Sequence, residues 1–161
     1  MNDVSLEFSL CSPVVTLNGA DVTDEIRSER VSLASSKIAK YTSVRKKLID
    51  FQRKFSRGHG LIADGRDMGS VIFPSADLKI FLTASVKVRA DRRYKELIAR
   101  GENVSLRDLE RRIALRDKGD RERKVSPLIA GEGAIVIDAS EKSVNEVKKE
   151  IIHYFDLVPS V

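Results

Sequence analysis

The stretch of sequence that decides the fold is residues 61–69, which read LIADGRDMG. A short apolar run ends here in Asp-Gly, a pattern typical of a buried parallel strand followed by a sharp turn. Open α/β sheets bind ligands outside the carboxyl ends of their strands. We therefore expect Asp64, Arg66 and Asp67 to face one crevice, although a single Asp-Gly is more often a plain turn with a solvated Arg–Asp pair.

Working outward, residues 79–82 and 134–137 are two further short apolar runs, and segments with helical spacing separate them. The helical segments extend over 86–100 and begin again at Ser105 and Ser143, each followed three residues later by an acid. This alternation predicts an α/β fold with a parallel sheet.

The N-terminal part has a different pattern. Residues 4–10 alternate apolar and polar, residues 14–17 form a second short strand pattern, and Asn18-Gly19 marks a turn after it. Two amphipathic helical segments follow, over 31–38 and 44–55. This region is predicted to be a small antiparallel sheet with helices.

Composition limits the class of protein. The chain has 161 residues, of which 42% are hydrophobic and 33% charged, so it can form one domain or a domain and a lobe. No apolar run approaches the roughly 20 residues of a membrane-spanning helix. The single cysteine, Cys11, excludes an intramolecular disulfide and a Cys-rich zinc site, and we expect a cytoplasmic setting. We find no Ser–His–acid arrangement around His59 or His153.

The net charge of +5 is unevenly distributed. Residues 1–26 hold five acids and no bases, whereas residues 27–57 hold ten Lys and Arg against two acids. Such a basic belt can attract nucleic acid, or it can surround a phosphorylated small molecule. Aromatic residues make up only 6% and there is no Trp, so the chain offers little surface for stacking single-stranded bases, and we do not expect nucleic acid as the partner.

Residues 116–124, RDKGDRERK, form the second charged constellation. The apolar spacing stops before it and Gly119 lies in its middle, so we expect a mobile segment just past a helix. Several guanidinium groups there can close over a polyphosphate. The plainer alternative is a solvated face whose charges pair with one another.

Taken together, these blocks resemble bacterial cytidylate kinase. The resemblance rests on the order and spacing of residues 61–74, 79–85, 89–93 and 116–127, and upstream on residues 21–27 and 36–45. It implies an α/β, P-loop nucleoside monophosphate kinase-like parallel sheet with helices, missing the first strand and P-loop, plus a small antiparallel nucleotide-binding insert. By this resemblance, residues 1–60 are part of the insert and residues 61–161 the kinase core, with a lid at about 105–127.

The resemblance also implies the roles of individual residues. Those that bind CMP or dCMP are Ser36, Arg45, Arg66, Asp67, Arg116, Asp120 and Arg123. The arginines that neutralise charge during phosphoryl transfer are Arg116, Arg121 and Arg123. Arg92 or Arg93 flanks the adenine of the donor ATP, and Asp64 reaches Mg²⁺ through water.

One departure from the family is serious: the 161 residues contain no Gly-x-x-x-x-Gly-Lys-[Ser/Thr] motif to cradle the phosphates of the donor. We therefore expect the sequence to start inside the family's insert, and the chain alone to be inactive or weakly active and prone to aggregate at unpaired strand edges. The alternatives are a non-catalytic CMP-binding remnant and a basic nucleic-acid-binding module. A complete enzyme of this kind is expected to be a monomer.

Overall fold

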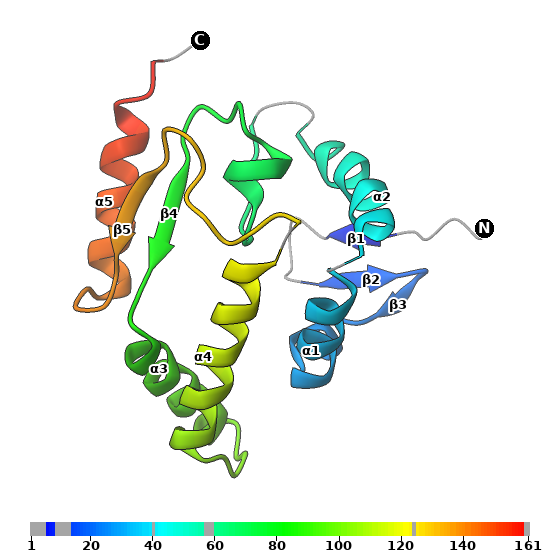
Figure 1. The fold of residues 1–161 in the computed structure, drawn as a ribbon, viewed down its shortest axis with the longest axis vertical. Helices are drawn as coiled ribbons and strands as arrows, with labels where there is room; N and C mark the ends of the chain where they lie inside the picture. The colour runs from blue at the N-terminus through cyan, green and yellow to red at the C-terminus, as the bar shows by residue number, and fades with distance from the viewer. Residues whose placement is uncertain (1–5, 9–13, 40, 57–59, 124, 160–161) are drawn as a thin grey trace. The chain divides into compact units, whose positions relative to one another are not determined.

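The computed structural model describes residues 6–8, 14–39, 41–56, 60–123 and 125–159 (Figure 1). Cys11, His59 and the ends of the strand expected at 4–10 lie outside these residues. The chain divides into two compact units, residues 1–48 and residues 49–161. Among the described residues, none of the helices has the length and apolar character needed to cross a bilayer.

The first unit contains an antiparallel sheet, as expected. β1 (Leu6–Phe8) pairs with β2 (Val15–Leu17), and β2 pairs with β3 (Ala20–Asp21). Asn18 and Gly19 between them have φ of 50° and 80°, the left-handed backbone that a tight hairpin turn requires. A 3₁₀ turn, η1 (Glu25–Arg27), leads to α1 (Glu29–Ile38). The prediction for this region is confirmed wherever the structure describes it.

α2 (Thr42–Arg53) is the second amphipathic helix, and it includes the boundary between the two units. Its carboxyl-terminal residues belong to the second unit, where Arg53 donates from Nε to the carbonyl oxygen of Ile72 at 2.8 Å and from Nη2 to that of Val71 at 3.1 Å. Arg53 thus holds the end of α2 against the segment that contains Val71 and Ile72.

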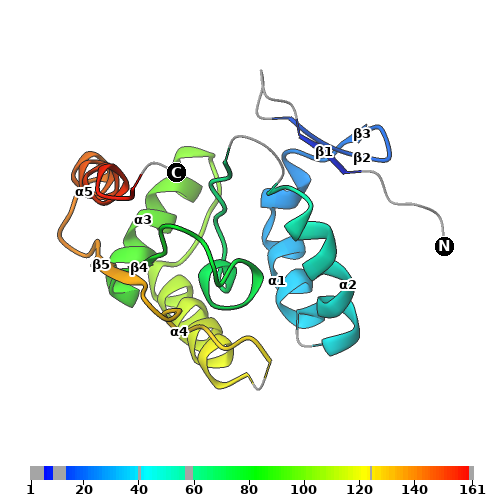
Figure 2. The ribbon, with the colours of Figure 1, turned by 90° about the horizontal axis from the view of Figure 1, so that it is seen from above.

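The second unit is built on a parallel pair of strands (Figure 2). β4 (Ile80–Thr83) and β5 (Ile135–Asp138) pair with Ile80 opposite Ile135, as the apolar runs predicted. Ile137 on β5 is 1% exposed and is part of the core. Helix α5 (Val144–Asp156) follows β5 and lies on the β5 side of the two strands. It begins with the expected capping box, in which Ser143 and Glu146 each bond the other's backbone amide.

Residues 61–63 do not form the buried strand that their apolar character predicts. They have no strand structure, and Ile62 is fully exposed. Among the described residues β4 pairs with β5 alone, so no ladder recruits residues 61–63 into the sheet. The physical reason is that a strand forms only where a partner satisfies its backbone donors and acceptors.

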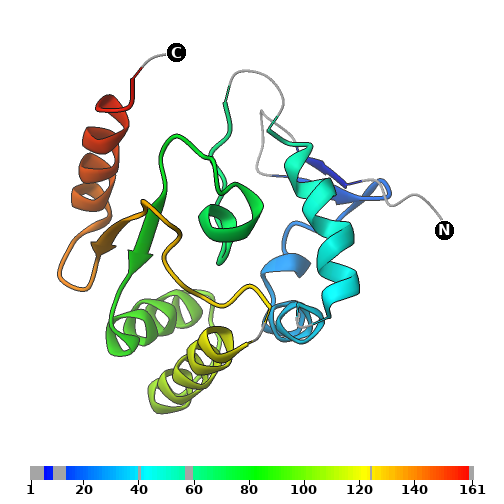
Figure 3. The same ribbon diagram turned by 45° about the horizontal axis from the view of Figure 1, so that its top comes forward.

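Helices α3 (Val86–Ala99) and α4 (Leu106–Glu122) pack side by side (Figure 3). Their contact buries Ala90 and Leu97 of α3 and Leu109 of α4. The expected ends are confirmed: Ser105 caps α4, and Gly101 follows α3 with a φ of 79°. Ile98 of α3 is 46% exposed.

The sequence predicts that residues 116–124 lie past a helix. This prediction is wrong for residues 116–122, which belong to α4. α4 continues through Gly119 to Glu122. Apolar periodicity stops after Leu115 because this end of the helix is held by charged contacts instead of apolar ones. A helix can therefore continue where its hydrophobic pattern ends, provided that buried polar groups find partners.

A π-helical turn, η2 (Met68–Ile72), follows the Asp64–Asp67 segment and packs against the loop before β5. A Cβ atom on Gly131 would lie 2.6 Å from the carbonyl oxygen of Gly69. This approach is too close for any side chain, so glycine at 131 is required for the two segments to touch.

We expect Gly131→Ala to lower the free energy of unfolding by about 1–3 kcal/mol, because the backbone of η2 would have to move. The matched control is Gly119→Ala in α4, where a Cβ atom meets nothing within 4 Å. This change should raise the free energy of unfolding by roughly 0.5–1 kcal/mol through helix propensity. Urea unfolding followed by circular dichroism measures both, and equal effects at the two positions would contradict the proposed packing.

Candidate functional site

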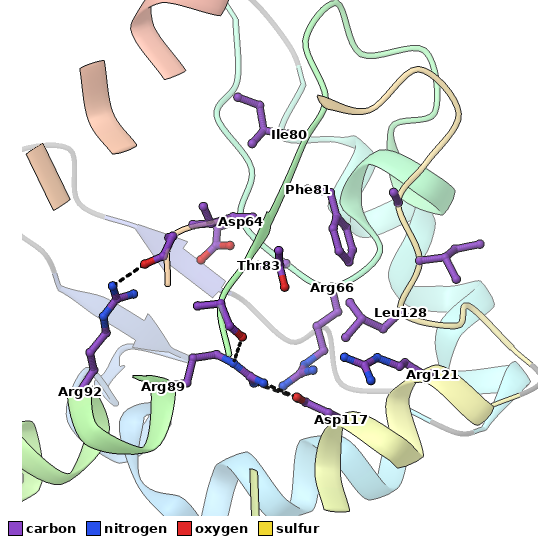
Figure 4. Close-up of a pocket in the computed structure, with 16 residues that line it drawn as sticks. Asp64, Arg66, Ile80, Phe81, Thr83, Arg89, Arg92, Asp117, Arg121 and Leu128 are labelled. Atoms are coloured by element: carbon purple, nitrogen blue, oxygen red, sulfur yellow. Dashed lines mark hydrogen bonds and ion pairs between the residues drawn. The ribbon is translucent and has the colours of Figure 1, made fainter. Parts of the chain in front are cut away.

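A cleft of about 750 Å³ runs along β4 to its carboxyl end (Figure 4). The end of the cleft is bounded by Thr83, the last residue of β4, by Ala84 after it and by Ala139 after β5. Its charged lining comes from three places in the sequence: the 64–66 segment, helix α3 and helix α4. The charged residues that line it are Asp64, Arg66, Arg89, Arg92, Asp117 and Arg121. A ligand seated there would meet more positive than negative groups.

Asp120 on α4 is the centre of a charged cluster in this unit. Its carboxylate is buried, with the side chain 9% exposed, and it forms ion pairs with Arg66 from the segment before η2 and with Arg123 at 3.4 Å. Arg116, one turn earlier on α4, lies 4.0 Å from the same carboxylate. The backbone carbonyl of Asp120 also accepts from the amide of Leu128 at 2.8 Å. We call these four residues, Arg66, Arg116, Asp120 and Arg123, the Asp120 cluster.

Arg123 completes the cluster at the end of α4. Its Nε donates to the carbonyl oxygen of Ser126, and its side chain is 9% exposed. The Nη2 atom is buried and has no hydrogen-bond partner within the part of the chain that the structure describes. A buried donor without an acceptor is energetically costly.

A second buried carboxylate, Asp117, lies one turn before Asp120 on α4. Arg89 of α3 binds it with both Nη atoms, Nη1 to Oδ1 at 3.0 Å and Nη2 to Oδ2. Figure 4 shows the guanidinium groups of Arg66, Arg89 and Arg121 turned toward the Asp117 end of the cleft. The two carboxylates on α4 thus form ion pairs with arginines from two other segments, Arg89 from α3 and Arg66 from the segment before η2.

The electrostatic environment of Arg66 reflects this crowding. Partial burial lowers the pKa of its guanidinium from the ordinary value; Asp120 opposes that shift, and Arg116 and Arg123 add to it. An arginine remains charged at neutral pH despite such a shift. The residual positive potential therefore favours an anionic ligand.

Asp67 is 8% exposed and belongs to the turn into η2, whereas Asp64 and Arg66 line the cleft. The expected shared crevice is thus seen for Asp64 and Arg66 but not for Asp67 in this structure. The amides of Val71 and Ile72 both donate to the backbone carbonyl of Asp67, at 2.9 and 3.2 Å.

Arg92 and Arg93 on α3 occupy different environments. Arg92 lines the cleft, but its Nη2 donates to the carbonyl oxygens of Ala139 and Lys142 at 2.7 and 3.1 Å, so it fastens the loop after β5. Arg93 pairs with Glu96 at 2.7 Å and is not part of the cleft lining.

Ser36 on α1 and Arg45 on α2 belong to the unit of residues 1–48. Arg45 donates from Nη1 to the carbonyl oxygen of Ala39 at 3.4 Å, a contact between the two helices of that unit.

Sequence reasoning missed Arg53, Arg89 and Asp117. Arg53 lies off the apolar stripe of its helix, and Arg89 and Asp117 were two among many charges. The sequence did contain a signal for Asp117. Asp117 and Asp120 are three residues apart, so in a helix they lie on the same face, and each carboxylate then needs a positively charged partner if it is buried.

Asp64 is the residue in the cleft to consider for a metal ion. It is exposed and projects into the cleft near Thr83. Among the described residues no three His, Cys, Asp or Glu side chains converge on a metal position. Mg²⁺ keeps several waters and is usually held by one or two carboxylates together with substrate phosphates. A single exposed carboxylate in a basic cleft fits that mode of binding.

We expect Asp120→Asn to lower the free energy of unfolding by roughly 3 kcal/mol, because it leaves the buried guanidinium of Arg123 without its charge partner. The control is Glu122→Gln on the same helix, whose exposed pair with Lys118 at 4.0 Å should contribute within about 0.5 kcal/mol. Chemical denaturation of both variants tests this, and equal small losses would show that Asp120 is not a structural centre.

Fold and cleft together define an α/β protein with a basic, anion-attracting site at the carboxyl end of parallel strands. A family model described as cytidylate kinase matches residues 1–157. The chain belongs to the cytidylate kinase family.

Three curated relatives illustrate the similarity. The cytidylate kinase of Dichelobacter nodosus is 42% identical over 163 residues, covering 97% of this chain and 73% of the relative. That of Nitrosococcus oceani is 47% identical over 138 residues, covering 86% of this chain and 61% of the relative. That of Methylococcus capsulatus is 50% identical over 133 residues, covering 83% of this chain and 60% of the relative. The matched parts are thus between 60% and 73% of the lengths of these three proteins.

Proposed function

We propose that this chain carries the nucleotide-acceptor side of a cytidylate kinase. The complete reaction transfers the γ-phosphoryl group of ATP to a phosphate oxygen of CMP or dCMP. The new P–O bond forms as the bond to the β,γ-bridging oxygen breaks, which releases ADP and the cytidine diphosphate. The observation that carries the proposal is the Asp120 cluster, because four of the seven residues that the family resemblance assigns to the acceptor nucleotide meet there, although Arg66 and Asp120 are 54 positions apart in sequence.

The charge of the cluster supports an acceptor that bears a phosphate. Three arginines around one carboxylate leave two positive charges uncompensated within the cluster. A phosphate monoester carries about −1.5 to −2 at pH 7. In this proposal Arg66 contacts that phosphate, and Arg116 and Asp120 contact the ribose.

Recognition of the base is assigned to Asp67 and Arg123. A carboxylate accepts from the exocyclic amine of cytosine, and a guanidinium donates to its carbonyl oxygen and ring nitrogen. Both assignments follow from the family resemblance. Ser36 and Arg45 are proposed to contribute to base recognition on the resemblance alone.

Catalysis in this class of reaction is mainly positioning and electrostatic stabilisation. We assign charge neutralisation to Arg116, Arg121 and Arg123, and contact with the adenine of ATP to Arg92 or Arg93. Bound Mg²⁺ would supply further neutralisation of the phosphate charge. Asp64 is the residue of this chain that would hold it, through water.

The fold proposed for the complete protein is the P-loop nucleoside monophosphate kinase fold. Residues 1–60 correspond to the nucleotide-binding insert and residues 61–161 to the kinase core, with the lid at about 105–127. The division into compact units after residue 48 lies within the proposed insert. The 161 residues contain no phosphate-binding Gly-Lys-[Ser/Thr] motif, and we therefore propose that they are inactive or weakly active as an isolated chain.

Isothermal titration of the 161-residue chain with CMP and dCMP tests the acceptor site. We expect measurable CMP affinity, and a loss of roughly tenfold or more in Arg66→Lys, because lysine keeps the charge but not the planar fork of donors. The control is Lys118→Gln, an exposed position on α4, which should leave the affinity unchanged.

Two results would redirect the interpretation. CMP affinity that Arg66→Lys does not alter would place the ligand elsewhere. Absence of CMP binding, together with nucleic-acid affinity that falls steeply with salt, would favour the basic nucleic-acid-binding module, since phosphate contacts release counterions.

A coupled assay of ADP release with CMP and ATP tests catalysis separately. We expect no release above background from the isolated 161-residue chain, because no motif in it holds the phosphates of the donor in line. Robust release would contradict the proposed inactivity while leaving the acceptor site in place, and CMP binding without release would match a non-catalytic CMP-binding remnant.

A further inference from the structure

The guanidinium of Arg89 has all three of its nitrogen atoms engaged in contacts within the protein. Nε donates to the carbonyl oxygen of Ala84 at 2.9 Å, and the two Nη atoms bind the two carboxylate oxygens of Asp117. The Asp117 side chain is 7% exposed and that of Arg89 is 33% exposed. Figure 4 draws these contacts as dashed lines within the lining of the cleft. One side chain of α3 thus joins the end of β4 to α4.

This linkage restricts how α4 can turn about its own axis. Packing between α3 and α4 uses small and branched apolar side chains, Ala90, Leu97 and Leu109. Such contacts tolerate small sliding and rotation, whereas two parallel hydrogen bonds to one planar carboxylate allow only a narrow range of directions. Asp117 is therefore the point at which the orientation of α4 is set.

Asp117 and Asp120 lie three residues apart on α4 and so share one face of the helix. Turning α4 enough to break the Asp117 pair would carry the Asp120 carboxylate away from Arg66, which lies on another segment, whereas Arg116 and Arg123 would move with the helix. The contact between Arg66 and Asp120, which joins α4 to the segment before η2, thus depends on the Arg89–Asp117 pair.

We propose that Arg89 and Asp117 are a positioning pair for the acceptor nucleotide. They orient α4 and act on the nucleotide through Asp120, without contacting the nucleotide themselves. This inference rests on the proposed function, since it concerns the same Asp120 cluster. It adds two residues to that site and gives them a role different from the roles of the four cluster residues.

A competing role for Arg89 is direct contact with a phosphate in the cleft, and the two roles make opposite predictions for Asp117→Asn. If Arg89 contacts a phosphate, removing the charge of Asp117 frees its guanidinium and leaves CMP affinity unchanged or higher. If the pair positions α4, the same change weakens CMP binding.

The experiment compares Arg89→Lys, Asp117→Asn and the double variant in the full 161-residue chain. Lysine keeps the charge at position 89 but not the fork, and asparagine keeps the shape at position 117 but not the charge. The control is Arg100→Lys at the carboxyl-terminal cap of α3, the helix that carries Arg89, where an exposed pair with Glu96 at 2.7 Å should not affect the site.

Two measurements are made on each variant. The first is CMP affinity by calorimetry. The second needs no ligand: the ¹⁵N-edited NMR signal of the Arg123 Nε–Hε group, which donates to the carbonyl oxygen of Ser126. Urea unfolding of each variant confirms that the comparison is made on folded protein.

We expect each single variant to weaken CMP binding roughly tenfold and the double variant to lose little more than either one, because the two residues act as a unit. The Arg123 Nε–Hε signal should shift, and its hydrogen exchange should accelerate, in all three variants and not in Arg100→Lys. An unchanged signal, or CMP affinity that Asp117→Asn leaves intact, would overturn the positioning role.

A wild-type chain that binds no CMP would contradict the proposed function and not this inference. In that case the Arg123 signal still decides whether Arg89 and Asp117 orient α4. If either variant unfolds, the other carries the same two readouts, and lysine at position 89 is the milder of the two changes.

Discussion

The rest of the second unit depends on the requirement that two buried carboxylates on one face of α4 find positive partners. Taking Asp117 and Asp120 out of water is expensive unless each carboxylate is paired and hydrogen-bonded. Their partners come from α3 and from the segment before η2, so satisfying the two charges brings three separate parts of the chain together. Ion pairs at the charged end of α4 therefore hold neighbouring segments together, as apolar packing does elsewhere in the unit.

The same arrangement explains why the site has a positive surplus. More guanidinium groups surround the two carboxylates than the carboxylates can neutralise. Partial burial makes the positive charge of these groups less favourable, and it lowers the pKa of Arg66. Arginines fixed in this way need little reorganisation when an anion arrives, which is the condition under which electrostatic stabilisation is most effective. Asp117 differs from Asp120 in having one arginine bound in full, which makes it suited to orientation and not to ligand contact.

Several elements of the fold were predictable from short patterns. The Asn18-Gly19 hairpin, the strands at β4 and β5 and the capped starts of α4 and α5 each follow from local backbone and side-chain preferences. The prediction of a strand at 61–63 was wrong because a strand forms only beside a partner strand. The predicted end of the helix before residue 116 was wrong because ion pairs, which leave no apolar periodicity in the sequence, stabilise this part of α4. Of the proposed acceptor residues, Arg66, Arg116, Asp120 and Arg123 share one cluster. Arg93, proposed for the donor ATP, pairs with Glu96 on the surface of α3.

The sequence by itself determined the α/β class, the positions of most elements and the family, because turn residues, caps and ordered blocks of motif are local properties of a chain. Only the tertiary structure decided which arginine belongs to which carboxylate. Arg89 and Asp117 look like any other charges in a segment rich in both signs. Their pairing follows from burial and from the geometry of two packed helices, which no short stretch of residues encodes.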